Sequence, residues 1–384
     1  MEYLKEQYKQ QIEHSRNKMK EAYNFANEKP VKYICDSCWW LFGQLPEQIP
    51  RDYCRGNFEC MLQYQLDMIK DHYKRGWNDC MEPILSPWYG TGVLPSGFGQ
   101  KVAYKDGMDP AVEMRNDIDE AFVKEMKLPD PYKDGQMPMV LETIDYFREH
   151  CDLDINLTDL QGPLSSAFNL VGYENFIYWM YDEPSLVHEL MEKVTDALIG
   201  WIRTQKKHIG VSDEEPSSMM HIRGLDGTGG VFIADDEAIL LSAEAYAEFA
   251  KPYNEKLFEA FSGGQIHCCG NVSHQAENFK ETKGLTMYHN MILGDFKHAA
   301  MTQKVLAEAG IPYVAGDFNP SDNSMEAYYD SLMQELSPRG LIVASYIAPA
   351  TSLINGKYET ARRDAKTVAG RINRIMEDKI KKYF

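Results

Sequence analysis

Eight short extended segments alternate with helical patterns along this 384-residue chain, and the alternation restricts the fold more than any other feature. Each segment is a short run of apolar residues, and amphipathic helical spacing follows most of them. The segments begin at about residues 31, 80, 155, 219, 265, 285, 311 and 341. Eight strands that alternate with helices are typical of a (β/α)8 barrel. We therefore predict an α/β fold of the TIM-barrel type, formed by residues 1–384 as a single domain.

Two flanking features complete this prediction. Residues 1–28 read as a charged N-terminal helix that ends at Lys29-Pro30, because proline cannot donate to a helix ladder. Residues 97–138 are irregular and predict an insertion or a long loop over one face. A doubly wound open sheet is the alternative fold. Its dinucleotide fingerprint is missing, because the glycine-rich turn at 224–230 does not follow the first strand.

Charge and composition exclude several classes of partner. The formal net charge of -18 argues against nucleic acid, which requires clustered Lys and Arg, and against an anionic membrane surface. No apolar run approaches the roughly 20 residues that span a bilayer, and the charged N-terminus is unlike a secretory signal. Eight cysteines are too sparse for a disulfide scaffold in a chain of this length. We expect a soluble, reduced, cytoplasmic protein.

The stretch from Gln265 to Asn271 carries the clearest chemical signal. It reads as a strand that ends on His267 and Cys269, with a glycine after them. Residues two apart in a strand share a face, so these two side chains could hold one ion while Cys268 points the other way. Imidazole and thiolate ligands favour zinc over magnesium or calcium. The alternative is a strand end with buried cysteines and a hydrogen-bonded histidine.

Other polar residues follow the predicted strands, where the chemistry of such barrels is placed. Three of the chain's ten histidines fall at these positions, which favours a functional site over an ordinary polar rim. The residues at these strand ends are Cys35, Asp36, Glu82, Asp159, Gln161, His221, Arg223, Asp226, His267, Cys269, His289, Asn290, Asp317, Ser345 and Tyr346.

Four motifs occur in a characteristic order between Asp154 and the C-terminus. They are Thr158-Asp159-Leu160-Gln161-Gly162-Pro163, Tyr181-Asp182-Glu183-Pro184, Ala234-Asp235-Asp236 with Pro252-Tyr253, and His267-Cys268-Cys269-Gly270-Asn271. Their order resembles the uroporphyrinogen decarboxylase superfamily, which includes the decarboxylase and the cobalamin-dependent methyltransferases. The last motif is similar to the H-x-C-G pattern of the methyltransferases. The resemblance implies a (β/α)8 barrel, in agreement with the strand count.

The resemblance also favours one branch of the superfamily. True decarboxylases carry an arginine-rich segment after the first strand, whereas this chain has Cys35-Asp36-Ser37-Cys38-Trp39-Trp40 and no arginine before Arg51. The methyltransferase branch fits better, with one departure. Its third zinc ligand is a cysteine after the last strand, where this chain has residues 344–348, Ala-Ser-Tyr-Ile-Ala. The resemblance then implies a replacement ligand, for which Glu82, His289 and Asp317 are the candidates.

These features together predict zinc-assisted methyl transfer between a small methylated donor or a thiol and a corrinoid carried by a partner protein. The alternatives are a decarboxylase-like carbon–carbon lyase and a non-catalytic corrinoid- or ligand-binding barrel. We assign His289, Asp317 and Tyr346 to catalysis, and expect Trp39, Trp40, Trp88 and Tyr89 to wall a dry pocket. A homodimer is the candidate assembly. The predicted substrate-binding residues are Glu82, Gln161, Arg223 and Asp226.

Overall fold

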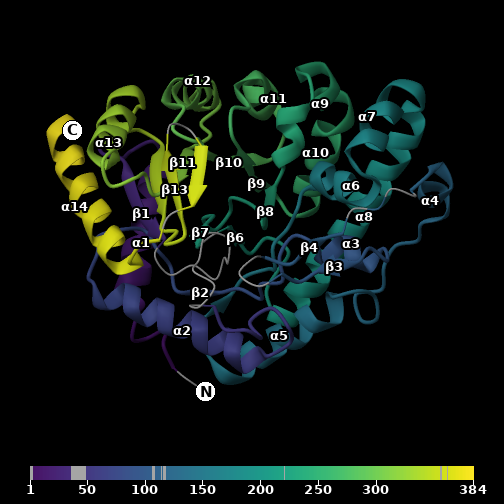
Figure 1. Cartoon of the computed structure of the whole chain (residues 1–384), viewed down its shortest axis with the longest axis horizontal. Helices are drawn as coiled ribbons and strands as arrows, with labels where there is room; N and C mark the ends of the chain where they lie inside the picture. The colour runs from purple at the N-terminus through teal and green to yellow at the C-terminus, as the bar shows by residue number, and fades with distance from the viewer. Residues whose placement is uncertain are drawn as a thin grey trace.

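Six parallel strands form one continuous sheet in the computed structural model, which describes residues 3–35, 49–105, 109–113, 115, 118–219, 221–354, 357–360 and 362–384. The strand order is β1-β12-β11-β10-β9-β8. The bounds are β1 Val31–Cys35, β8 Val231–Ala234, β9 Gly264–Cys269, β10 Leu285–Met291, β11 Tyr313–Phe318 and β12 Leu341–Tyr346. Helices surround these strands (Figure 1).

Two short strands close the sheet into a ring. β2 (Ile84–Leu85) pairs in parallel with β5 (Asp154–Ile155). The Cys80 amide donates to the Lys32 carbonyl at 3.0 Å, which joins this pair to β1. On the other side, the Ala234 amide donates to the Leu160 carbonyl at 2.9 Å, which joins it to β8. The predicted (β/α)8 barrel is therefore confirmed, with six regular strands and two short ones.

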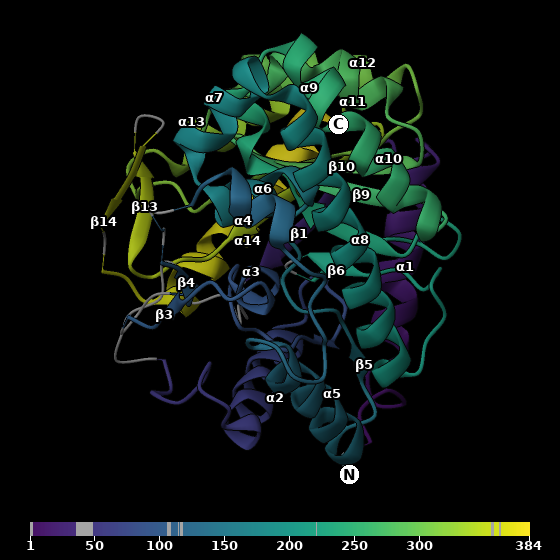
Figure 2. The same cartoon turned by 90° about the vertical axis from the view of Figure 1, so that its right-hand side faces the viewer.

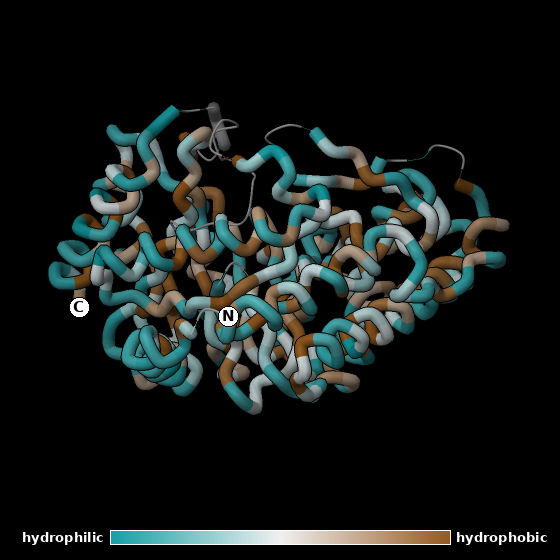
Figure 3. Tube along the Cα trace, turned by 90° about the horizontal axis from the view of Figure 1, so that it is seen from below, coloured by the Kyte–Doolittle hydropathy of each residue, from teal (hydrophilic) through white to brown (hydrophobic). Residues whose placement is uncertain are grey.

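The helices of the outer layer pack one apolar face on the barrel. In α14, Val368, Ile372 and Ile375 are buried at helical spacing, and the Asp364 side chain caps the first turn by accepting from the Thr367 amide at 2.8 Å. Hydrophilic and hydrophobic residues accordingly alternate along the helices (Figure 3). The main helices are α1 Lys9–Tyr23, α2 Phe58–Lys74, α5 Met137–His150, α6 Pro163–Val171, α7 Tyr173–Asp182, α8 Pro184–Ile209, α9 Ala243–Phe249, α10 Lys251–Ala260, α11 Ala276–Glu281, α12 Phe296–Ala307, α13 Met325–Glu335 and α14 Ala365–Tyr383. No helix within the described ranges is long and apolar enough to cross a bilayer.

The fourth barrel strand lies elsewhere than predicted. The segment beginning at residue 219 forms a tight antiparallel hairpin of β6 (Ser218–Met219) and β7 (Ile222–Arg223). His221 in this hairpin has φ +64°, a left-handed conformation typical of a turn. The barrel strand is β8, twelve residues further along. Both segments are short and apolar, so local pattern alone did not separate them.

Other departures are confined to connections. The irregular stretch 97–138 contains the small hairpin of β3 (Val102–Ala103) and β4 (Ala111–Val112), and helix α4 (Glu120–Glu125). The last helix, α14, begins at Ala365. A hairpin of β13 (Thr351–Ile354) and β14 (Lys357–Thr360) precedes it and stands at one side of the barrel (Figure 2).

Candidate active site

Strand β9 places His267 and Cys269 on one face, as the alternation of side chains predicts. His267 lies opposite His289 of β10, and Cys269 lies opposite Met291. Cys268 points to the other face, where its thiol donates to the Asp235 carbonyl at 3.2 Å. His267 is therefore directed into the barrel interior together with His289, because neighbours in a parallel sheet point to the same side.

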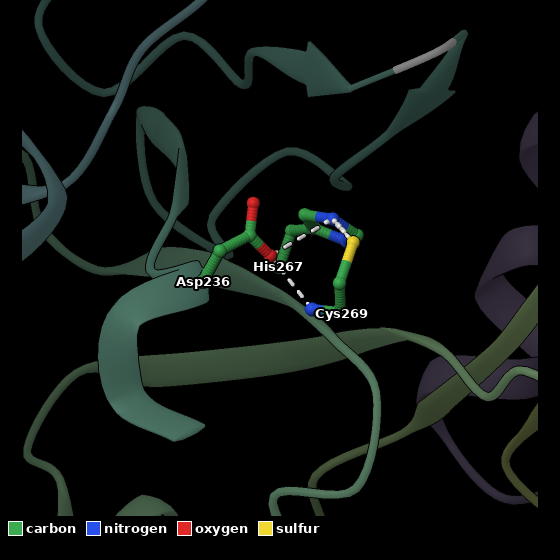
Figure 4. Close-up of side chains that lie close together, drawn as sticks. All are labelled: Asp236, His267 and Cys269. Carbon is green, nitrogen blue, oxygen red and sulfur yellow. Dashed lines mark hydrogen bonds and ion pairs between the residues drawn. The ribbon is translucent and has the colours of Figure 1, made fainter. Parts of the chain in front are cut away.

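Three different donor atoms converge where β8 and β9 end. His267 Nε2 lies 3.3 Å from Cys269 Sγ and 3.5 Å from Asp236 Oδ1. One ligand atom from each of the three residues falls within 4.8 Å of the others (Figure 4). We call this group the donor cluster: Asp236, His267 and Cys269. It combines carboxylate oxygen, imidazole nitrogen and sulfur at the carboxyl ends of barrel strands, the position of active sites in this fold.

Asp236 is the member of the donor cluster that sequence reasoning did not select. It begins the short helix η2 (Asp236–Leu240) directly after β8, and its carboxylate accepts a hydrogen bond from the Cys269 amide at 2.6 Å. The available signal was the apolar run Val231–Ala234 after two glycines, followed by two aspartates. Because the fourth strand was placed at residue 219, Asp236 was not recognised as a residue at a strand end.

A chain of hydrogen bonds extends from the donor cluster across the barrel. His267 Nδ1 and His289 Nδ1 share a hydrogen bond of 2.5 Å, and His289 Nε2 lies 2.6 Å from Tyr346 Oη. Burial lowers the pKa of His267, and burial together with His267 lowers the pKa of His289 well below its usual value. Both imidazoles are therefore neutral near pH 7, which is the form that binds metals.

Gly316 of β11 makes room for this chain. A Cβ atom at this position would lie 2.8 Å from His289 Nε2 and 2.9 Å from Tyr346 Cε2. Both distances are shorter than carbon atoms tolerate, so a side chain here would push the two rings apart. The absence of a side chain at residue 316 is therefore a requirement of the His289–Tyr346 hydrogen bond.

The electrostatic environment holds Cys269 as a neutral thiol when no cation is near. Desolvation in the barrel mouth and the Asp236 carboxylate both raise the pKa of Cys269 well above its usual value, although the residue keeps access to solvent. A divalent cation between these groups would reverse the effect, because it stabilises thiolate and carboxylate together. The donor cluster is thus electrostatically suited to a cation.

Gln161 and Asp317, two other predicted site residues, both lie close to strand ends. The Asp317 side chain, however, lies on the outer face of the sheet. Gln161 pairs with Ala234 in a parallel bridge and donates to Asp159 at 2.9 Å, so it lies beside the strand that leads to Asp236. Asp317 lies opposite Ser345, on the outer face of the sheet. Its carboxylate accepts from the Leu293 and Gly294 amides and from the Tyr328 hydroxyl at 2.6–3.0 Å. Asp317 therefore fixes the loop after β10, and its predicted catalytic role stays a prediction.

The remaining predicted substrate-binding residues lie at the opposite end of the barrel. Glu82 precedes β2, and Arg223 pairs with it at 3.8 Å and with Asp154, the first residue of β5, at 2.8 Å. Asp226 lines a cavity that also contacts Leu285, the first residue of β10. These three residues do not follow barrel strands as predicted: Arg223 is the last residue of the β6–β7 hairpin, Asp226 follows that hairpin, and Glu82 precedes β2. Their predicted role in binding substrate stays a prediction.

Of the four aromatic residues predicted to wall a pocket, the structure describes Trp88 and Tyr89. Trp88 borders a small interior cavity with Asp159 and donates from its indole to Asp109 at 2.7 Å. Tyr89 is fully buried and bonds Thr143 of α5, so it belongs to the packing between barrel and helices. Trp39 and Trp40 lie outside the described residues, as do Asp36 and Cys38.

A closed (β/α)8 barrel with convergent oxygen, nitrogen and sulfur donors at the carboxyl ends of its strands has the design of a barrel enzyme. Comparison with known proteins shows which proteins the chain is similar to. The family model "Uroporphyrinogen decarboxylase (URO-D)" matches residues 89–212, a region that ends before the donor cluster. The matched residues make up less than half of the chain, and over them the chain is similar to the uroporphyrinogen decarboxylase family.

The curated relatives include a methyltransferase and several uroporphyrinogen decarboxylases. A methylated-thiol–coenzyme M methyltransferase of Methanosarcina mazei is 28% identical over 152 residues, which cover 38% of this chain and 36% of the relative. A uroporphyrinogen decarboxylase of Campylobacter concisus is 25% identical over 251 residues, which cover 61% and 64%. A uroporphyrinogen decarboxylase of Shewanella amazonensis is 24% identical over 177 residues, with 44% of each chain covered. Each match spans less than two thirds of the relative's own length.

The fold as a whole also has a solved counterpart. The structure of a methyltransferase from Methanosarcina mazei superposes with a TM-score of 0.65 and covers 96% of this chain and 98% of that protein. At 17% sequence identity the agreement concerns the fold alone. It extends the similarity over β8 and β9, which the family model does not reach.

Proposed function

We propose that this protein is a zinc-assisted methyltransferase that moves a methyl group between a small methylated substrate, or a thiol, and a corrinoid carried by a partner protein. The observation that carries the proposal is the Asp236 carboxylate beside His267 and Cys269. It supplies a third ligand in a chain that has no cysteine after Cys269. The methyltransferase of Methanosarcina mazei among the relatives supports the choice of reaction.

The donor cluster fits zinc in both chemistry and spacing. Zinc binds sulfur at about 2.3 Å and nitrogen or oxygen at about 2.0–2.2 Å, so ligands of a tetrahedral site lie roughly 3.3–3.7 Å apart. The separations of His267 Nε2 from Cys269 Sγ and Asp236 Oδ1, 3.3 and 3.5 Å, agree with this spacing. Three protein ligands leave a fourth position for substrate, which is typical of catalytic rather than structural zinc.

The surrounding residues hold the imidazole ligand in one orientation. With His267 Nε2 directed to the donor cluster, its Nδ1–H donates to His289 Nδ1, and His289 Nε2–H then donates to Tyr346 Oη. Such outer partners fix the tautomer and ring direction of a metal-binding histidine. His289 and Tyr346 therefore act on the reaction by positioning His267.

The ligand set also bears on the substrate. Zinc bound here would polarise an oxygen- or nitrogen-bound methyl group, or hold a thiol as thiolate. A carboxylate donates less electron density than the second thiolate it replaces, which leaves the ion more electrophilic. This favours an oxygen- or nitrogen-bound methyl donor, with the thiol reaction as the alternative within the same proposal.

Decarboxylation is the second candidate, because the matching family model and several relatives are uroporphyrinogen decarboxylases. Against it, the sequence after β1 has no arginine before Arg51 to pair with the carboxylates of a tetrapyrrole. Incubation with uroporphyrinogen separates the two candidates. Formation of coproporphyrinogen would establish the decarboxylase, and its absence together with methyl transfer to cob(I)alamin would exclude it.

Metal analysis and turnover test the proposal together. Purified protein should contain about one zinc per chain, and His267→Ala, Cys269→Ala and Asp236→Asn should each lose zinc and methyl transfer to cob(I)alamin. Cys60→Ala is the matched control and should keep both, because this free thiol lies on helix α2 and is not part of the donor cluster. Zinc-free wild-type protein that still transfers methyl groups would refute the metal role. Binding of cob(I)alamin without turnover would favour a non-catalytic barrel.

A further inference from the structure

A cavity of about 330 Å³ lies at the amino-terminal end of the barrel strands, opposite the donor cluster. Its walls come from the start of β5, the C-terminal end of α8 and the segment leading into β6. The volume is at the lower end of the range for small-molecule sites. The polar side chains that line it are Lys5, Arg148, Asp152, Asp154, Asn156, Lys206, Glu215, Ser217, Ser218 and Arg223.

Lys206 is the unusual residue of this cavity. It is only 2% exposed, and its ammonium donates to the Glu215 backbone carbonyl at 2.6 Å. Within the described residues no carboxylate forms an ion pair with it. Burial lowers the pKa of Lys206 to about 8, so it still carries its charge at neutral pH. A buried charge without an opposite charge is unfavourable and attracts an anion.

The carboxylates around the cavity are already engaged by other groups. Asp154 pairs with Lys5 at 2.6 Å and with Arg223 at 2.8 Å. Glu215 pairs through its side chain with Arg223, and only its backbone oxygen reaches Lys206. Glu215 and Asp213 lie near enough to favour the charge on Lys206, but within the described residues neither forms an ion pair with it.

Two serines that line the same cavity as Lys206 have hydroxyl groups without partners in the described part of the chain. Ser217 and Ser218 are 5% and 7% exposed, both line the cavity, and neither hydroxyl has a hydrogen-bond partner within the described part of the chain. Buried hydroxyls normally have one, and a serine hydroxyl can turn to donate to a ligand. Lys206 lies in the last turn of α8, where the helix dipole favours a cation, and this alone could account for the lysine. It does not account for the two hydroxyls without partners.

We propose that this cavity is a second binding site, which takes a small oxyanion, a carboxylate or a phosphate, on the Lys206 ammonium with the hydroxyls of Ser217 and Ser218. The ligand would supply the missing negative charge and accept from both serines. This site does not depend on the methyltransferase proposal, because it shares no residue with the donor cluster and lies at the other end of the barrel.

Calorimetric titration of the full chain with inorganic phosphate, and separately with succinate, tests the proposal and distinguishes the two sources of oxyanion. At least one should bind saturably at millimolar concentrations, and Lys206→Met should weaken binding about tenfold or more, because a charge-assisted hydrogen bond is lost. Lys207→Met is the matched control: the neighbouring lysine is exposed, and its loss should leave binding unchanged.

A second variant keeps the test decisive if Lys206→Met does not fold. The double substitution Ser217→Ala and Ser218→Ala removes only two hydroxyl oxygens and should weaken binding several-fold. The proposal is refuted if neither anion binds the wild-type chain, or if the serine variant binds as tightly as wild type.

Discussion

Replacing Gly316 by alanine should destabilise the protein through the hydrogen-bonded chain in the barrel. The added Cβ would lie 2.8 Å from His289 Nε2 and 2.9 Å from Tyr346 Cε2, so one of the two rings must move. The hydrogen bond of 2.6 Å between these side chains would then lengthen or break. Both rings are fully buried and packed between strands, so neither can turn towards solvent.

The cost follows from two contributions. Extra volume in a packed interior costs about 1–3 kcal/mol. Loss of a buried hydrogen bond adds about 1 kcal/mol. We expect the free energy of unfolding of Gly316→Ala to fall by about 2–4 kcal/mol.

Urea denaturation at neutral pH measures this change, with Gly200→Ala as the matched control. Gly200 is exposed within α8, and an added Cβ meets no atom within 4 Å. Alanine there should raise the free energy of unfolding by about 0.5–1 kcal/mol, because glycine is unfavourable inside a helix. The same chemical change should therefore have opposite signs at the two positions. A Gly316→Ala protein as stable as wild type would show that the His289–Tyr346 contact does not require this space.

Two further predictions concern buried charges. Burial, with Asp109 and Asp236 nearby, raises the pKa of Asp159 to about 6. Its ionised form is therefore unfavourable in the folded state, so Asp159→Asn should gain stability over wild type as pH rises from about 4 to 6, reaching about 1–3 kcal/mol above pH 6. Urea denaturation of both proteins across this pH range measures the difference in their free energies of unfolding. A difference that does not change with pH would contradict the prediction. Arg223→Met should cost about 3–5 kcal/mol at neutral pH, because it leaves Glu82 and Asp154 without this shared cation. A loss below about 1 kcal/mol in the same assay would show that Arg16 and Lys5 suffice.

The sequence was informative where residues act through local geometry. Alternation along β9 correctly predicted that His267 and Cys269 share a face and that Cys268 does not. Local rules also account for α2, which has apolar residues at helical spacing, and for α9, whose first turn Ser242 caps by accepting from the Ala245 amide at 3.1 Å. Each of these features depends on a few neighbouring residues, so the local sequence pattern is sufficient to predict it.

The sequence was less informative where the position of a strand depends on distant pairing. The segments at 219 and 231 are both short and apolar, and only pairing with β9 makes β8 the barrel strand. That single choice moved Arg223 to the wrong end of the barrel and hid Asp236. For Asp317 the strand was predicted correctly, and the outward direction follows from alternation starting at Tyr313, which brings its carboxylate to the loop at Leu293.

X-ray absorption at the zinc edge, on protein purified without added chelator, most directly tests whether the ends of β8 and β9 hold a metal ion. A site formed by Asp236, His267 and Cys269 predicts one sulfur at about 2.3 Å and nitrogen or oxygen ligands at about 2.0–2.2 Å, in fourfold coordination. Cys269→Ser should remove the sulfur contribution while Cys60→Ala leaves the spectrum unchanged. A wild-type spectrum without sulfur, or one that keeps its sulfur in Cys269→Ser, would contradict the site.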